Sequence, residues 1–176
     1  WSKPGLYGWN KIDKGSQFLA DNLEGLNISL AESRILDLGC GYGYLSCKAV
    51  ELGATMIVAT DNCAAAVLAC NKNLELLKTQ GDFVCSADDC ADEISRKFDL
   101  ILCNPPFHAG FSISSELHQR FVRAIHNKLA DKGQALVVVN QFLRLQNICE
   151  ENGLEIVERI RDNQHHFDLY RLQHRR

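Results

Sequence analysis

The sequence RILDLGCGYG at residues 34–43 decides the fold of this chain. Its first five residues predict a short buried strand, and residues 44–52 predict a helix that ends at Gly53. Three glycines between strand and helix permit a tight turn and let a ligand approach the backbone closely. The dinucleotide-binding fingerprint would need a glycine at position 44, which is Tyr44 here, so the grip on an NAD pyrophosphate is incomplete.

Strands and helices alternate on both sides of this stretch. Further strands are predicted at residues 55–60, 82–86, 98–103, 135–139, 154–160 and 167–172, and further helices at 17–23, 64–77, 116–129 and 142–151. Nearly continuous apolar strands between helices are typical of a largely parallel sheet with helices on both faces. The last two strands, joined by a polar stretch, indicate a hairpin at one end of the sheet, and residues 131–133 indicate a turn.

Length and composition fit one domain over residues 1–176, with an N-terminal arm and helix at 1–30 and a cofactor-binding core at 31–176. The net charge of −3 argues against a large electrostatic footprint for nucleic acid. No apolar run approaches the roughly 18 residues that span a bilayer, so no membrane contact is expected. Because the chain begins with Trp1 rather than Met, we expect it to be a fragment of a longer protein.

The eight cysteines contain no C-x-x-C pair, and without that spacing neither a zinc site nor any other metal site is expected. Several lie in apolar runs, and Cys63 and Cys70 share one face of a predicted helix. Free cysteine behaves as a small buried hydrophobe. We therefore interpret the cysteines as reduced core thiols of a cytoplasmic protein.

A second motif, Asn104-Pro105-Pro106-Phe107, ends the predicted strand at 98–103. Proline fixes φ and lacks an N–H, so the backbone here offers mainly acceptors, and the residue before it is held extended. An Asn side-chain oxygen beside a proline carbonyl suits a planar NH2 group, and Phe107 adds a flat face for stacking. A strand followed by a proline turn is the alternative.

Three acidic residues follow or end predicted strands, where an open α/β sheet binds its ligands. Asp37 either faces a cationic ligand or holds the glycine loop. Asp61 lies where an acid accepts hydrogen bonds from ribose hydroxyls, and Asp88 could reach an adenine amine. Each could instead cap a helix N-terminus.

With these residues together, the chain resembles the class I S-adenosylmethionine-dependent methyltransferases over nearly its whole length. Residues 36–43 look like their motif I, and residues 104–107 are similar to the (Asn/Asp)-Pro-Pro-(Tyr/Phe) motif of enzymes that methylate amino or amide nitrogens. Within that group the chain resembles the catalytic C-terminal half of the ribosomal RNA small subunit methyltransferase C family. The residues that carry this likeness are Pro4-Gly5-Leu6-Tyr7-Gly8, Asp13-x-Gly15-Ser16, His108-x-Gly110 and Tyr170-Arg171.

The resemblance implies a Rossmann-like, mostly parallel seven-stranded sheet with an antiparallel last strand. It implies an enzyme that transfers a methyl group from S-adenosylmethionine to the exocyclic N2 amine of a guanosine in 16S ribosomal RNA. It also implies a degenerate N-terminal half, not present in this chain. The residues implied to hold the cofactor are Ser16, Asp37, Gly39, Cys40, Gly41, Gly43, Asp61, Asn62, Asp88 and Asn104; those implied to hold the reacting amine are Asn104, Pro105, Pro106 and Phe107.

Two alternatives remain open from the sequence. A protein glutamine N5-methyltransferase would use the same NH2 geometry, although those enzymes typically have Tyr where this chain has Phe107. A non-catalytic module that binds S-adenosylmethionine or RNA would not need an intact Asn104. His108 either contacts the substrate or is an exposed loop residue, and Arg171, Arg175 and Arg176 either contact RNA or are merely solvated.

Overall fold

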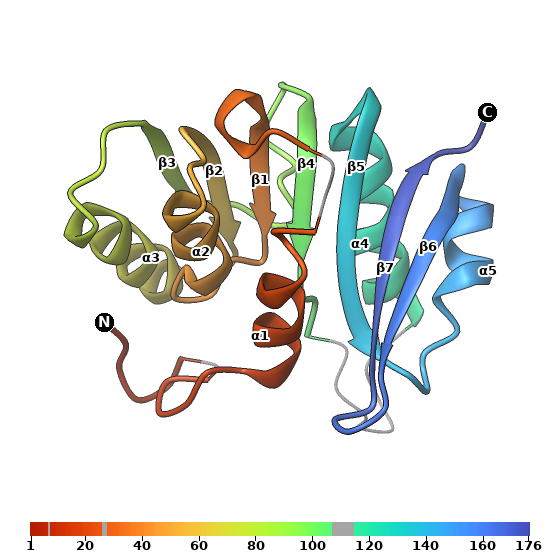
Figure 1. The fold of residues 1–176 in the computed structure, drawn as a ribbon, viewed down its shortest axis with the longest axis horizontal. Helices are drawn as coiled ribbons and strands as arrows, with labels where there is room; N and C mark the ends of the chain where they lie inside the picture. Colours follow the sequence, from red (N-terminus) through yellow and green to blue (C-terminus); the bar gives the residue numbers. More distant parts are fainter. Residues whose placement is uncertain (7, 26–27, 107–114) are drawn as a thin grey trace.

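The computed structural model describes residues 1–6, 8–25, 28–106 and 115–176, and Figure 1 shows their arrangement. In chain order the elements are α1 (Lys14–Asp21), the 3-10 turn η1 (Leu30–Glu32), β1 (Arg34–Leu38), α2 (Tyr44–Glu51), β2 (Met56–Asp61), α3 (Ala64–Leu76), β3 (Asp82–Ala87), β4 (Phe98–Cys103), α4 (Ser115–Lys128), β5 (Leu129–Asn140), α5 (Leu145–Glu151), β6 (Leu154–Asp162) and β7 (Phe167–His174).

The strands form one seven-stranded sheet in the order β3-β2-β1-β4-β5-β7-β6. The first five strands in this order, β3, β2, β1, β4 and β5, pair in parallel with their neighbours. Strand β7 runs antiparallel to both β5 and β6. This confirms the predicted mostly parallel sheet with a reversed last strand. The reversed strand lies inside the sheet, and β6 forms the edge. The strand order changes direction between β1 and β4, which is where open α/β sheets bind ligands.

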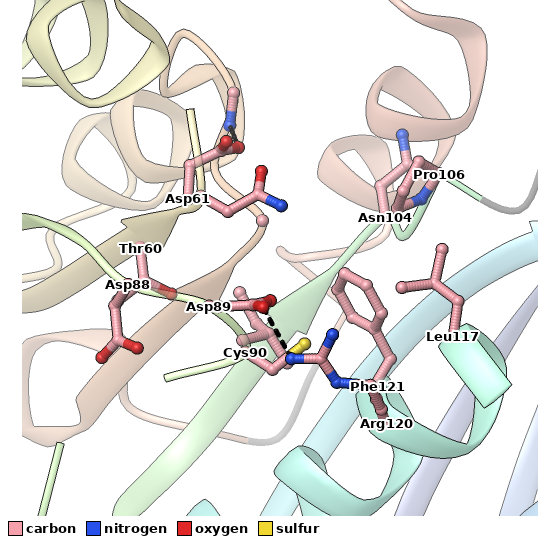
Figure 2. Close-up of a pocket in the computed structure, with 14 residues that line it drawn as sticks. Thr60, Asp61, Asp88, Asp89, Cys90, Asn104, Pro106, Leu117, Arg120 and Phe121 are labelled. Carbon is pink, nitrogen blue, oxygen red and sulfur yellow. Dashed lines mark hydrogen bonds and ion pairs between the residues drawn. The ribbon is translucent and has the colours of Figure 1, made fainter. Parts of the chain in front are cut away.

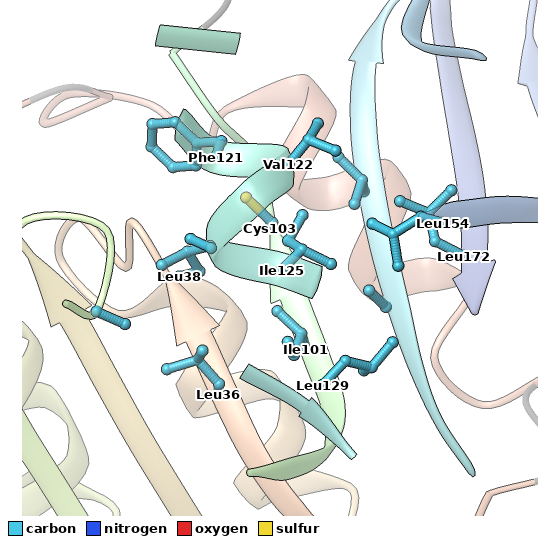
Figure 3. Close-up of a cluster of buried hydrophobic side chains, with 14 of the residues drawn as sticks. Leu36, Leu38, Ile101, Cys103, Phe121, Val122, Ile125, Leu129, Leu154 and Leu172 are labelled. Carbon is cyan, nitrogen blue, oxygen red and sulfur yellow. The ribbon is translucent and has the colours of Figure 1, made fainter. Parts of the chain in front are cut away.

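The central strands are buried on both faces, and successive residues alternate between two cores. Leu36, Leu38 and Ile101 belong to the core under α4 and α5 (Figure 3). Their neighbours Ile35 and Leu100 belong to the core under α1, α2 and α3. This alternation follows from the two-residue period of a strand, and it confirms the prediction of helices on both faces.

Strand β5 begins earlier than predicted. The residues expected to form a turn at 131–133 lie inside it, beside a register irregularity opposite Phe98. A Cβ on Gly133 would lie 2.8 Å from the Phe98 carbonyl oxygen, so the two backbones touch here. The Asp-Lys-Gly sequence therefore lies at a register irregularity within a strand rather than in a connection between elements.

The prediction that the cysteines are core residues is wrong for Cys63, which is exposed before the first turn of α3. Five others are buried, as expected for small apolar side chains: Cys40, Cys70, Cys90, Cys103 and Cys149. In the described part of the chain, every helix is too short or too polar to cross a membrane.

Candidate active site

The glycine loop after β1 is fastened to β2 and α3. The backbone N–H groups of Gly39 and Cys40 both donate to the Thr60 carbonyl, at 2.9 and 2.8 Å. Gly43 has φ +85°, and a Cβ there would lie 2.5 Å from the Cys70 sulfur. Gly41 has φ +55° and open space where its Cβ would be. The loop therefore packs tightly at Gly43 and leaves room for a ligand at Gly41.

Asp61, at the end of β2, holds this loop and also the residue that precedes α3. Its Oδ2 accepts from the Gly41 N–H at 2.9 Å, and its Oδ1 accepts from the Cys63 N–H at 2.8 Å. Each carboxylate oxygen has two lone pairs, so both retain capacity for ligand hydroxyls. Asp61 is not the N-cap of α3, which is Cys63, so the capping alternative does not describe its contacts. Its bonds to Gly41 and Cys63 are compatible with the predicted ribose-binding role.

Asp37 lies beneath the loop, on the side of the sheet covered by α2. It is 1% exposed, and its Oδ2 accepts hydrogen bonds from the backbone N–H and the hydroxyl of Ser46, at 3.0 and 2.6 Å. Its Oδ1 has no hydrogen-bond partner among the described residues. Burial raises the pKa of this carboxyl to about 6, against the lowering effect of the Ser46 bonds. The contacts with α2 match the loop-holding alternative, and its predicted contact with a cofactor stays a prediction.

Asn104 follows β4 directly, beside the glycine loop, because Leu38 and Cys103 are partners in the β1–β4 register. Its side-chain nitrogen donates to Asp13 Oδ2 at 2.6 Å and to Ser16 Oγ at 2.8 Å. Both amide hydrogens are thereby used. The side-chain oxygen is the polar atom of Asn104 that remains for a ligand.

Two adjoining cavities open at this edge of the sheet. The large cavity has a volume of about 300 Å³, and Figure 2 shows Asp61 and Asn104 on opposite sides of it. The small cavity of about 50 Å³ shares Gly39, Gly41 and Asn104 with the large one. The large cavity is also lined by Leu38, Thr60, Asp61, Asn62, Asp88, Asp89, Cys90, Pro106, Leu117, Arg120 and Phe121, and the small one by Asp13, Ser16, Cys40, Tyr42, Tyr44 and Leu45.

The wall of the large cavity distant from Asn104 is acidic and conformationally unusual. Asp88 Oδ2 accepts from the Glu93 N–H at 3.2 Å, so it stabilises a turn while it lines the cavity. Asp89 forms an ion pair of 2.7 Å with Arg120 of α4, drawn as a dashed line in Figure 2. Cys90 has φ +57°, a left-handed conformation that is uncommon for residues other than glycine. Such strain clusters at ligand sites.

The structure brings most of the predicted site residues together. Those that line one or both cavities are Ser16, Gly39, Cys40, Gly41, Asp61, Asn62, Asp88, Asn104 and Pro106. Gly43 packs on α3, and Pro105 is buried and does not line either cavity. Phe107 and His108 lie outside the described residues. Arg171 forms an ion pair with Glu158.

Sequence reasoning missed several residues that line the cavities. Asp13 was noted only as part of a motif, although an Asp before a helix signals an N-cap, and its Oδ2 does accept from the Ser16 N–H at 2.8 Å. Arg120 and Phe121 lie on α4, whose apolar face predicts burial but not which ligand site it approaches. Only the packing of α4 against β4 and the glycine loop reveals them.

The cavities fit S-adenosylmethionine, a flat adenosine joined to a cationic sulfonium and an amino acid. Apolar side chains of Leu38, Leu117 and Phe121 line the large cavity together with carboxylates. The carboxylates suit hydroxyl and amine donors, and an acidic surrounding suits a cation. Among the residues that the structure describes, no group of three His, Cys, Asp or Glu is placed to hold a metal ion.

The strand order and the position of the cavities are those of a Rossmann-like methyltransferase. The structure superposes with a TM-score of 0.82 on the 16S rRNA N2 G1207 methyltransferase of T. thermophilus in complex with AdoMet and guanosine, at 25% identity over 99% of this chain and 46% of that one. The ribosomal protein L11 methylase of Lactobacillus delbrueckii subsp. bulgaricus shares the fold, with a TM-score of 0.78 and 22% identity over 99% of this chain and 84% of that one.

The family model of the methyltransferase small domain matches residues 1–171, and the chain belongs to this family. It is 31% identical over 144 residues to ribosomal RNA small subunit methyltransferase C of Pseudoalteromonas atlantica, covering 81% of this chain and 40% of the relative. It is 36% identical over 166 residues to ribosomal RNA large subunit methyltransferase G of Aliivibrio fischeri, covering 91% of this chain and 42% of the relative. The chain thus spans about two fifths of the length of these relatives.

Proposed function

We propose that this chain transfers a methyl group from S-adenosylmethionine to the exocyclic N2 amine of a guanosine in small-subunit ribosomal RNA. The observation that carries the proposal is the orientation of Asn104, whose amide nitrogen is occupied and whose oxygen remains for a donor. The similarity to proteins named for small-subunit rRNA methylation, one of them solved with AdoMet and guanosine, supports the substrate.

The residues of the two cavities divide the binding of the cofactor between them. Asp61 would accept from the ribose hydroxyls, while Asn62 and Asp88 would lie against the adenine. Ser16, Cys40 and Gly41 of the small cavity would hold the amino-acid end. When bound, the cofactor supplies an activated methyl group, so the chain itself need not supply a nucleophile or a metal.

The task of this chain in the reaction is to hold and orient an amine. Asn104 Oδ1 and the Pro105 carbonyl would each accept one N–H of the planar NH2 group, which turns its lone pair towards the cofactor. As positive charge develops on the nitrogen, these fixed dipoles stabilise it without reorganising. A guanine would have to leave its stack to reach this edge of the sheet.

Incubation with labelled S-adenosylmethionine and a choice of acceptors tests the proposal. We expect label in N2-methylguanosine when small ribosomal subunits are the acceptor, and loss of at least about 100-fold in turnover in Asn104→Ala with cofactor affinity retained. Nucleoside digestion and mass spectrometry identify the product. Label in large subunits would favour the second candidate, large-subunit rRNA methylation, which the 36% identity to methyltransferase G supports. Label in release-factor glutamine would contradict both.

A further inference from the structure

The side chain of Asn104 is held by a turn far away in the sequence. Its two amide hydrogens go to Asp13 Oδ2 at 2.6 Å and Ser16 Oγ at 2.8 Å, across 91 and 88 positions of the chain. Asp13 and Ser16 flank the first residues of α1, and both line the small cavity with Asn104. The start of α1 therefore contacts the residue that the proposed reaction depends on most.

The partners of Asn104 allow only one orientation of its amide. A carboxylate accepts hydrogen bonds and donates none, so it must face the NH2 group rather than the carbonyl oxygen. Rotation of the amide by half a turn would place Asn104 Oδ1 against Asp13 Oδ2, two acceptors in contact, and would lose the hydrogen bond to Asp13, whereas the Ser16 hydroxyl can donate as well as accept. Because Asp13 Oδ2 is itself fixed by the Ser16 N–H at 2.8 Å, it cannot easily move aside.

Gly15, between Asp13 and Ser16, lets this turn approach Asn104 closely. A Cβ at Gly15 would lie 3.2 Å from Asn104 Oδ1, 3.2 Å from Asp13 Oδ2 and 3.3 Å from a ring carbon of Phe167. These separations are tight for carbon, so a side chain here would press on the oxygen that must accept from the substrate. The Asp-x-Gly-Ser sequence thus supplies two acceptors and the space between them.

We propose that Asp13, assisted by Ser16, is a positioning residue that presents the oxygen of Asn104 to the reacting amine. This inference rests on the proposed function. It adds two residues that lie outside the motif at residues 104–107. A negative charge at the amide nitrogen also polarises the amide, which makes its oxygen a stronger acceptor. The acceptor is then strongest where positive charge develops during methyl transfer.

A purely structural role for Asp13 is the competing explanation, because it caps α1. Asp13→Ser separates the two roles. Serine is as good an N-cap as aspartate, but its shorter side chain ends before the Asn104 amide. Asp13→Asn retains a cap and a neutral acceptor of the same length. Asp99→Ser is the matched control, since Asp99 also accepts a backbone N–H, that of Arg34 at 3.0 Å. Asp99 lies near the starts of β1 and β4, at the ends of these strands opposite to the cavities.

The decisive experiment is a double-mutant cycle in single-turnover methylation of small ribosomal subunits. We expect Asp13→Ser to lower the methyl-transfer rate at least tenfold, with cofactor Kd by calorimetry changed less than threefold and Tm close to that of the parent. Asp13→Asn should retain more of the rate than Asp13→Ser, and Asp99→Ser should retain all of it. In the Asn104→Ala background, Asp13→Ser should cause no further loss. An equal loss in both backgrounds, or a loss confined to cofactor Kd, would overturn the proposal.

A second readout does not depend on the acceptor. In nuclear magnetic resonance spectra of the whole chain, the side-chain NH2 protons of Asn104 should exchange slowly with water and speed up at least tenfold in Asp13→Ser. If the parent protein does not methylate small subunits but shows this change, the proposed function fails while the positioning contact stands. If Asn104 exchanges equally fast in both proteins, the positioning role is wrong whatever the substrate.

Discussion

At the scale of single residues, the site depends on carboxylates that already accept hydrogen bonds from the backbone and keep further lone pairs for a ligand. Asp61 illustrates this, since it accepts N–H groups from both Gly41 and Cys63. A residue of this kind fixes the conformation of the glycine loop before any ligand binds. Its replacement should therefore affect ligand affinity through two routes, a lost acceptor and a looser loop.

Asp61→Ala should weaken cofactor affinity about 10- to 100-fold, the range expected when hydrogen bonds to a charged acceptor are lost. Isothermal titration with S-adenosylmethionine measures this directly. Asp82→Ala, at the exposed start of β3, is the control and should leave the affinity unchanged. Unchanged affinity in Asp61→Ala would remove the ribose-hydroxyl assignment.

Asp37 should give the protein a measurable pH dependence. Its pKa in the folded chain is about 6, above the ordinary value of 3.8, so the native state binds this proton more tightly than the unfolded state does. The stability from this group is complete below about pH 4 and is lost as the pH rises through 6. A pKa raised from 3.8 to about 6 corresponds to about 3 kcal/mol.

Asp37→Asn should remove this part of the pH dependence between pH 4 and 7, measured by urea unfolding at several pH values. The paired carboxyls Asp89 and Asp99 have lowered pKa values and titrate at more acidic pH, so they do not obscure the window. If the difference in unfolding free energy between parent and variant did not change with pH, Asp37 would not be the buried acid that its surroundings indicate.

At the scale of elements, the glycine loop joins β1 to α2 and is confined unequally along its length. A Cβ on Gly43 would lie 2.5 Å from the Cys70 sulfur and 3.0 Å from the Cys70 Cα. A Cβ on Gly41 would meet open space at the cavity. The two glycines are therefore required for different reasons, one for packing against α3 and one for room at the ligand.

The pair Gly41→Ala and Gly43→Ala tests this distinction. Gly43→Ala should destabilise the fold by about 2–4 kcal/mol, because α2 and α3 must separate as well as accept a positive φ. Gly41→Ala should cost about 1 kcal/mol from backbone strain alone, yet weaken cofactor binding at least tenfold. Thermal unfolding and calorimetry separate the two effects. Equal losses of stability would contradict the open space seen at Gly41.

At the scale of the whole molecule, the charge distribution bears on how the chain meets RNA. The net charge is −3, and several arginines form ion pairs with carboxylates, including Arg159 and Arg161 with the buried Asp168. Guanidinium groups held in this way are less available to phosphates. The proposed RNA contact should therefore depend more on the shape of the site than on total charge.

Binding of this chain to small-subunit rRNA should accordingly show a shallow salt dependence. We expect a slope of log K against log salt no steeper than about −3, equivalent to about three phosphate contacts. Filter binding between about 50 and 200 mM salt, the range in which phosphate contacts weaken, measures it. A slope near −8 would show a basic surface that the described residues do not reveal.

The strand and helix order, the glycine loop and the Asn-Pro-Pro corner could be predicted from the sequence, because hydrophobic period and backbone restriction are local properties. The position of residues 131–133 within β5 could not be predicted, since an Asp-Lys-Gly sequence fits a strand irregularity as well as a turn. The contact of Asp13 with Asn104 and the ion pair of Arg120 with Asp89 are visible only in the three-dimensional structure. Such contacts depend on how distant elements pack, which no local pattern encodes.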